Sequence, residues 1–410
     1  MPYWITSLAG IGLILLIAYL ASTNRKAISL RVVGSAFALQ IAIAVFVFYV
    51  PFGRTAIESM SSGVSALLGY SQAGINMVFG PLASDNMGVI FAVRVLPILI
   101  FFSSLVAVLY HVGIMQRVVA WVGGALQKTI GTAPVESLNA TANIFVSQTE
   151  APFVIKPYLS SLSKPQLFAI MVSGMASVSG SVLAAYAQFG INIEYLLIAS
   201  FMAAPGGLLM AKIIMPDDNA SKVDNKDLVN LKDAKTEHSN VIMAAAVGAQ
   251  DGLMLAVNIG GMLIAFVSLI ALLNGIVGYA GGLVGIDNLS VEMVLGYIFA
   301  PVMFMLDIPW NEAQTAGAIF GEKLILNEFV AYISLGEIQD TLSPRTAAIT
   351  TFALCGFANL SSIAIMLGAL GSLIKDRMSD IAALGLRAVL AASLSNLMSA
   401  ALAGLLISPT

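Results

Sequence analysis

The sequence predicts an all-α polytopic membrane protein with eight transmembrane helices, two re-entrant helical hairpins and interfacial helices, arranged as an inverted repeat. Of the 410 residues, 59% are hydrophobic and only 10% are charged, whereas a soluble domain carries about 25% charged residues. Several apolar runs reach the length of about 20 residues that a helix needs to cross a bilayer. Two other segments carry polar residues at their centres, and these predict the hairpins.

Six uninterrupted apolar runs are the clearest spans. They cover residues 4–22, 32–51, 88–110, 193–215, 255–275 and 382–407. The first run has no basic n-region and no A-x-A cleavage site, so we expect a retained span and not a signal peptide. Two interrupted helices, described below, bring the predicted total to eight.

The distribution of basic residues predicts the orientation of these spans. With eight spans, all but four of the 19 lysines and arginines fall on the cytoplasmic side. The exceptions are Arg54, Lys323 and Arg345 on the outer side and Arg94 within a span. This bias places both termini outside the cell.

Three segments are not expected to cross the membrane. Residues 54–79 and 115–130 each carry an apolar stripe on one helical face, which is typical of helices lying in the interface. Residues 216–240 form the only long charged stretch, which is expected to be a solvated cytoplasmic loop.

The first predicted hairpin covers residues 132–162 and has the polar sequence SQTEAP at 147–152 near its centre. Consecutive residues of a regular helix point about 100° apart, so Gln148, Thr149 and Glu150 could not face one ligand there. At a hairpin tip the helix has ended and the three side chains can converge. Such backbone is tolerated at membrane depth only where it lines a cavity or is buried in protein.

The same layout occurs a second time. A second hairpin, at about 288–336, holds further carboxylates and asparagines, and each hairpin precedes a helix interrupted by small and polar residues. These broken helices cover 164–190, with the sequence SGMASVSGSV, and 345–375, with CGFANLSSIA. Paired broken helices in two inverted halves are typical of secondary transporters.

Two classes of protein fit the buried glutamates Glu150 and Glu328. Intramembrane carboxylates are costly and usually functional, so they could serve a transporter or act as an acid–base pair in a membrane-embedded hydrolase. The sequence has two histidines, one cysteine and no H-E-x-x-H, G-x-S-x-G or Walker A motif, which argues against hydrolysis and for transport. Nothing in the composition indicates a nucleic-acid partner.

Three motifs resemble those of the concentrative nucleoside transporters. GEKLILNEFVAY at 321–332 is similar to the long G-x-K-x-x-x-N-E-F-V-A-Y signature of that family, and QTEAP at 148–152 and FANLSS at 357–362 match two further motifs in order. The resemblance extends along the whole chain. One departure is Ser147, where the family commonly has glycine.

The resemblance implies a homotrimer in the bacterial inner membrane that imports nucleosides with sodium by an elevator-type movement, and no enzymatic activity. It also implies a division of the chain into scaffold and transport parts. The scaffold comprises 1–110 together with the loop and long helix of 216–275, and the transport domain comprises 111–215 and 276–410.

The candidate substrate site draws on both halves. In the first half, Gln148, Thr149 and Glu150 can match the polar edge of a nucleobase, with Val182 as an apolar wall. In the second half, Glu328 can accept from two ribose hydroxyls. The remaining candidates of the second half are Phe357, Asn359 and Ser362.

A sodium site is predicted beside the first hairpin tip, where Asn143 and Ser177 offer side-chain oxygens. Freed backbone carbonyls supply further hard ligands at a broken helix, and the resemblance implies those of Val146 and Val178. The alternative is proton coupling through Glu150 or Glu328. Proton-coupled relatives tend to lack the asparagine at position 143, so sodium is favoured.

Overall fold

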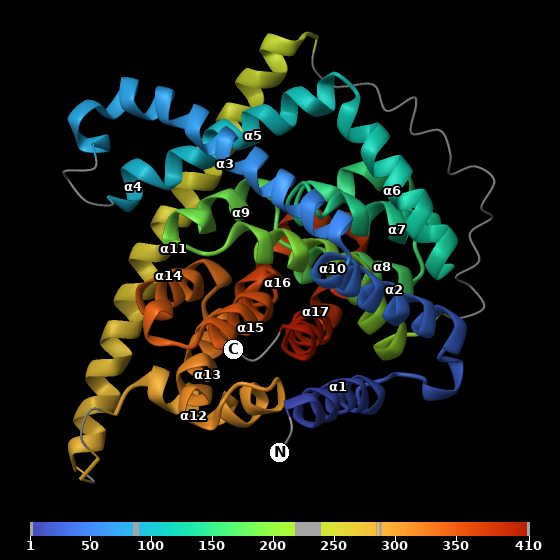
Figure 1. Ribbon diagram of the computed structural model, residues 1–410. Helices are drawn as coiled ribbons and strands as arrows, with labels where there is room; N and C mark the ends of the chain where they lie inside the picture. Colours follow the sequence, from blue (N-terminus) through green and yellow to red (C-terminus); the bar gives the residue numbers. More distant parts are fainter. Residues whose placement is uncertain (1–2, 85–89, 218–238, 284, 287–288, 408–410) are drawn as a thin grey trace.

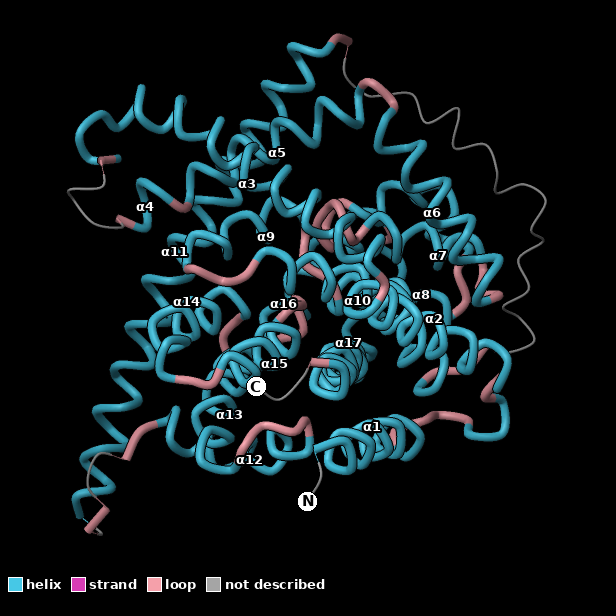
Figure 2. The backbone as a smooth tube through the Cα atoms, viewed as in Figure 1, coloured by secondary structure: helices cyan, strands magenta, loops and turns pink. Residues whose placement is uncertain are grey.

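The computed structural model describes residues 3–84, 90–217, 239–283, 285–286 and 289–407, and these form helices and loops without a β-strand (Figure 1, Figure 2). The α-helices are α1 (Tyr3–Leu20), α2 (Leu30–Tyr49), α3 (Pro51–Phe79), α4 (Phe91–Arg94), α5 (Leu96–His111), α6 (Ile114–Ile130), α7 (Pro134–Ala142), α8 (Lys164–Ala176), α9 (Gly180–Tyr186), α10 (Ile193–Ile214), α11 (Val241–Leu283), α12 (Val291–Met305), α13 (Trp310–Ile325), α14 (Glu328–Ile338), α15 (Pro344–Leu354), α16 (Leu360–Leu373) and α17 (Met378–Leu406). A 3₁₀ segment, η4 (Ala151–Ser161), follows the first hairpin tip.

The first half contains the predicted hairpin and broken helix. Helix α7 leads to the tip, and η4 leads away from it. The 3₁₀ segment begins next to Pro152, which lacks the backbone N–H that a helix ladder needs. Helix α8 ends at Ala176 and α9 begins at Gly180, so the predicted break falls within residues 177–179. The charged loop 216–240 lies largely outside the described residues.

The second half repeats this arrangement with one addition. Helices α13 and α14 form the hairpin, and its tip holds Asn327 and Glu328. Helix α12, which the sequence placed inside that hairpin, is a separate helix bent by 117° from α13. Asp307 adopts a positive φ of 71° at this bend and is bound there by Thr6 and Arg345. Helices α15 and α16 are separated by the predicted break at residues 355–359.

Helix α11 runs along one side of the molecule over most of its height (Figure 1). It packs closely on α5 because glycines replace side chains at the contact. A Cβ atom on Gly248 would lie 2.5 Å from the Cβ of Ala107, and one on Gly252 would lie 2.7 Å from the Cα of Ile100. Small residues allow such close approach of helices in a membrane.

The number of membrane spans is only partly settled by the structure. Within the described residues, six helical segments are long and apolar enough to cross a bilayer, or seven if the bent pair α12–α13 counts as one span. Helices α1 and α16 are apolar but shorter. The predicted total of eight includes these two, and it stays a prediction.

Two lysines that the sequence assigned to the membrane surfaces are buried. Lys323, predicted on the outer side, has 0% of its surface exposed, and Lys212, predicted on the cytoplasmic side, has 3%. Lys212 lies between Glu136 and Asp217, with Nζ–O distances of 2.6 and 2.5 Å. The positive-inside rule counts charges in loops, so two cations that tertiary contacts hold in the protein interior carry little weight in it, and the predicted orientation stays a prediction.

Candidate functional site

A cavity of about 120 Å³ lies where the two hairpin tips meet the two broken helices. It is lined by Ser147, Gln148, Thr149, Val182, Leu255, Ile259, Met262, Asn327, Glu328, Phe329, Phe357, Asn359, Ser361, Ser362 and Ile365. Seven of the eight predicted substrate-site residues are therefore at one cavity, although they come from segments far apart in sequence. The exception is Glu150.

The first hairpin tip presents an amide to this cavity. Gln148 is buried, and its Nε2 donates to Oγ of Ser362 at 3.2 Å. Its Oε1 is buried without a hydrogen-bond partner among the described residues. Thr149 is paired with Ser147 at 2.7 Å between hydroxyl oxygens. The free amide oxygen of Gln148 can accept a hydrogen bond, and the Thr149 hydroxyl can donate or accept one, so both are suited to the polar edge of a heterocycle.

Glu150 is not among the residues that line the cavity. The residue is exposed, and Oε2 accepts from the backbone N–H of Ser147 at 3.0 Å, which closes the tip turn. The carboxylate therefore helps to shape the tip, and its contact with a substrate stays a prediction.

The second hairpin tip presents a carboxylate. Glu328 begins α14, and its two oxygens accept one hydrogen bond each, from the hydroxyl of Tyr186 and from Nδ2 of Asn359, both at 3.0 Å. Tyr186 was not among the predicted residues. It ends α9 and is fully buried, and no local pattern indicates that it faces the other half of the molecule.

Asn359 has a second role as the N-cap of α16. Its Oδ1 accepts from the backbone N–H of Ser362 at 2.8 Å and from the hydroxyl of Ser361 at 2.7 Å. Capping uses the side-chain oxygen, so the amide nitrogen is left to bind Glu328. Phe357 lines the cavity next to this cap. One residue thus fixes both the helix start and the orientation of the carboxylate.

The four predicted sodium ligands lie together at the first tip. Ser177 Oγ is 2.8 Å from the backbone oxygen of Asn143 and 3.3 Å from that of Val178, and all four residues, Val146 included, are buried. Asn143 Oδ1 has no hydrogen-bond partner among the described residues. A buried amide oxygen without a donor is costly, and a hard cation such as sodium would satisfy it.

This group of oxygens includes no carboxylate. Among the described residues no group of three or more His, Cys, Asp or Glu side chains is placed to hold a metal ion. Neutral oxygens alone fit a weakly bound monovalent ion better than a structural divalent metal.

The two helix breaks are in direct contact. The backbone N–H of Phe357, in the second break, donates to the backbone oxygen of Ser177, in the first, at 3.2 Å. Ser177, whose side-chain oxygen is predicted to bind the ion, is therefore joined through its backbone by one hydrogen bond to the segment that forms the substrate cavity.

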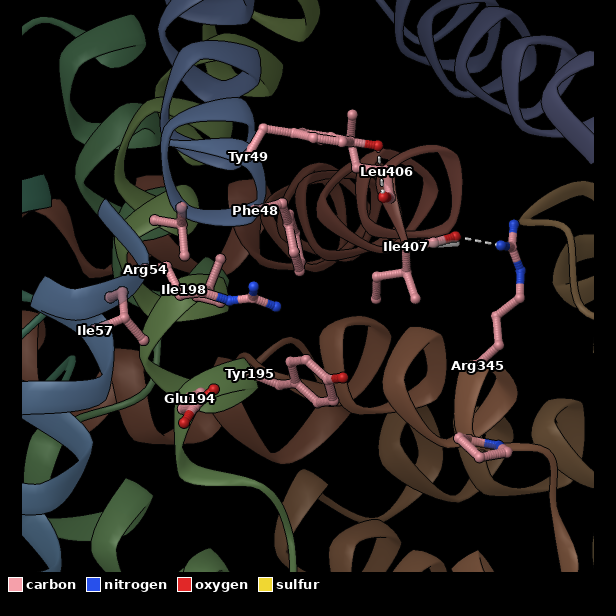
Figure 3. A pocket seen from close by; sticks show the side chains of 12 residues that line it. Phe48, Tyr49, Arg54, Ile57, Glu194, Tyr195, Ile198, Arg345, Leu406 and Ile407 are labelled. Carbon is pink, nitrogen blue, oxygen red and sulfur yellow. Dashed lines mark hydrogen bonds between the residues drawn. The ribbon is translucent and has the colours of Figure 1, made fainter. Parts of the chain in front are cut away.

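A second, larger cavity of about 360 Å³ lies elsewhere, among α2, α3, α10, α15 and α17 (Figure 3). Arg54, Glu194 and Tyr195 line it, together with Tyr49, whose hydroxyl donates to the backbone oxygen of Leu406 at 2.9 Å. It contains none of the predicted site residues. Although this cavity is larger, the 120 Å³ cavity gathers the buried polar groups that point to a ligand.

Three family models match consecutive parts of the chain. Residues 9–82 match the N-terminus of the Na⁺ dependent nucleoside transporters, residues 92–192 match a nucleoside recognition (gate) model, and residues 195–404 match the C-terminus of the same transporters. Together these matches cover most of the chain.

The relatives have transport functions. The chain is 48% identical over 413 residues to the nucleoside permease NupC of Helicobacter pylori, covering 98% of this chain and 97% of the relative. It is 37% identical over 423 residues to the sodium/nucleoside cotransporter 1 of Homo sapiens, covering all of this chain and 64% of the relative.

Solved structures agree with the fold. CNTnw in an inward-facing substrate-bound state is 46% identical, with a TM-score of 0.94 and 98% of both chains covered. A variant of CNTnw in an intermediate state has a TM-score of 0.95 at 46% identity, with 99% of both chains covered.

Proposed function

This chain belongs to the Na⁺ dependent nucleoside transporter family, and from that premise we propose that it imports nucleosides by symport with sodium. The relatives are permeases and cotransporters, not enzymes, so the glutamates serve transport and the hydrolase alternative is set aside. Sodium is the co-transported ion of the family. Its coupling to nucleoside movement in this chain is our proposal.

The cavity between the two hairpin tips carries this proposal. On one side Gln148 and Thr149 offer neutral donors and acceptors for a nucleobase, with Val182 as the apolar wall. On the other side Glu328 offers a charged acceptor for ribose hydroxyls, which makes stronger hydrogen bonds than a neutral one. A nucleoside has a polar ring edge at one end and vicinal hydroxyls at the other, so its two ends match the two sides.

Sodium is the proposed coupling ion because of the oxygens beside the first tip. Asn143 Oδ1, Ser177 Oγ and the backbone oxygens of Val146 and Val178 are the proposed ligands. An ion bound there would hold the tip against the broken helix, and it would raise nucleoside affinity by favouring the state in which the cavity is complete.

The movement is proposed to be of the elevator type. A transport domain of 111–215 and 276–410 would move against a scaffold of 1–110 and 216–275, in a homotrimer of the bacterial inner membrane with both termini outside. Support comes from CNTnw, whose structures include inward-facing, intermediate and outward-facing states.

Uptake into proteoliposomes tests the proposal. Purified protein is reconstituted, and uptake of radiolabelled uridine and adenosine is measured under an imposed inward sodium gradient or an imposed proton gradient. We expect concentrative uptake with sodium alone. Uptake that follows only the proton gradient would favour proton coupling through Glu150 or Glu328, and an absence of uptake of either nucleoside would contradict the substrate.

A further inference from the structure

A buried asparagine in α17 contacts both helix breaks. Asn396 is 1% exposed, and its Nδ2 donates to the backbone oxygens of Ala176 and Cys355, both at 2.7 Å. Ala176 is the last residue of α8 and immediately precedes Ser177, a proposed sodium ligand. Cys355 is the first residue of the second break. A single amide therefore bridges the ends of α8 and α15.

A buried lysine fixes the orientation of that amide. Lys323 Nζ donates to Oδ1 of Asn396 at 2.7 Å and to the backbone oxygen of Ala353 at 2.8 Å. Because the ammonium can only donate, it must face the amide oxygen, and the amide nitrogen then faces the two carbonyls. Lys323 belongs to α13, five residues before Glu328 on the second hairpin.

These bonds occupy carbonyls that the interrupted helices leave free. The last carbonyls of a helix lack intrahelical partners, and burial without a partner costs about 1–3 kcal/mol for each group. The oxygens of Ala176, Ala353 and Cys355 are all satisfied by the Asn396–Lys323 pair. The ends of the two broken helices therefore share one set of partners.

The packing around Gly356 leaves no room for a side chain. A Cβ atom on Gly356 would lie 2.3 Å from Oδ1 of Asn396 and 2.7 Å from the backbone oxygen of Ala176. Gly356 lies in the second break, one residue before Phe357, whose N–H donates to the Ser177 oxygen. The two breaks and Asn396 are therefore in close contact, and a displacement of either break would break hydrogen bonds that join it to the other.

We propose that Asn396 and Lys323 are positioning residues that couple the cation site at the first break to the nucleoside site at the second. An ion bound by the oxygens of Ser177 and Val178 would restrict the movement of the neighbouring Ala176. Because Asn396 binds both Ala176 and Cys355, it would also restrict the segment after Cys355, which holds Phe357 and Asn359. The inference rests on the proposed sodium symport and identifies the contact by which the two ligands affect each other.

The test measures the sodium dependence of nucleoside binding in Asn396→Asp. The substitution keeps the side-chain shape and an acceptor for Lys323, but it removes both donors to the helix ends. Uridine binding is measured by calorimetry in sodium and in choline, and the ratio of the two Kd values is the coupling factor. Typical coupling factors are about 5–150. We expect the variant to fall to within about twofold of 1, with its choline Kd within about threefold of wild type.

Ser399→Ala is the matched control. Ser399 lies one turn along α17, is buried, and accepts from Nε2 of Gln40 at 3.0 Å, so the control also loses a buried hydrogen bond but leaves the breaks intact. It should keep the wild-type coupling factor. If Asn396→Asp weakens uridine binding equally in sodium and choline, the residue only supports the structure and the coupling role is wrong.

Hydrogen exchange on the wild-type protein gives a second test that requires no variant. Sodium without nucleoside should slow amide exchange at 355–359, in the second break, and leave the α11 segment 248–252 unchanged. Exchange at 355–359 that ignores sodium would overturn the proposal. If uridine binding to the wild-type protein does not depend on sodium, the proposed symport is wrong. That result is obtained on the wild type alone, so it is distinguished from a failure of the role proposed for Asn396.

Discussion

The two helix breaks differ in the groups that satisfy their backbone oxygens. At the second break the protein supplies its own cation, since the Lys323 ammonium binds the Ala353 oxygen directly and the Cys355 oxygen through Asn396. At the first break Asn396 also donates to the Ala176 oxygen, but Asn143 Oδ1, a proposed sodium ligand, has no donor among the described residues. Each half contains a hairpin and a broken helix, but only the second half has a lysine beside its break.

From this difference we propose that the ion site lies in the first half and has no counterpart in the second. A buried carbonyl cluster needs positive charge or hydrogen-bond donors, and a covalently attached lysine provides them permanently in the second half. In the first half an ion from solution can provide them, and its binding then depends on concentration. The half that contains Lys323 also carries Glu328, the carboxylate proposed to bind the substrate, whereas the half proposed to bind sodium presents the neutral Gln148.

The largest expected effect comes from removing the charged acceptor. Glu328→Ala should lose hydrogen bonds to two ribose hydroxyls, at about 1.5–3 kcal/mol for each bond to a charged group, so uridine affinity should fall on the order of 100-fold or more. Binding is measured by calorimetry. Glu312→Ala is the control, because that glutamate lies in the same hairpin but binds Ser343 outside the cavity. Equal losses in both variants would contradict the assignment.

The next effect concerns the ion. Asn143→Ala should remove most of the sodium dependence of uridine binding, a coupling free energy of about 1–3 kcal/mol. Titration of uridine at several sodium concentrations measures it. Asn139→Ala, one turn earlier, loses a buried bond to Ser173 and should keep the dependence. An unchanged sodium response in Asn143→Ala would show that this amide only stabilises the hairpin.

A smaller effect is expected from changing the substrate. Without one ribose hydroxyl, 2′-deoxyuridine or 3′-deoxyuridine should bind less well than uridine by about 1.5–3 kcal/mol, the cost of one lost bond to a charged group. Competition against labelled uridine measures the difference. The penalty should shrink in Glu328→Gln, where the charge is gone. If both analogues compete as well as uridine, Glu328 does not bind the sugar.

The smallest effect should come from the neutral side. Gln148→Ala removes neutral hydrogen bonds, at about 0.5–1.5 kcal/mol for each, so uridine affinity should fall several-fold, less than in Glu328→Ala. Equilibrium binding in saturating sodium measures it, and Gln339→Ala, outside the cavity, is the control. A loss as large as that of Glu328→Ala would mean that the two sides of the cavity do not differ as proposed.

The sequence predicted most of the elements because interruptions of apolar runs are local features. Both helix breaks fall within the predicted segments, since Gly and Ser weaken the ladder wherever the helix packs. The extent of the second hairpin was less well predicted. Residues 291–305 are as apolar as a hairpin arm, and the bend that separates them from α13 depends on Thr6 and Arg345, which are distant in sequence from Asp307.

The sequence by itself determined the membrane class, the family and the polar residues at the two tips, because hydropathy, motif strings and costly buried carboxylates can all be read along the chain. Tertiary structure decided which of those groups meet. Only packing places Tyr186 on Glu328 and buries Lys323 against Asn396. Each of these contacts joins residues many positions apart, and each depends on the shape left by the neighbouring helices, which no local pattern encodes.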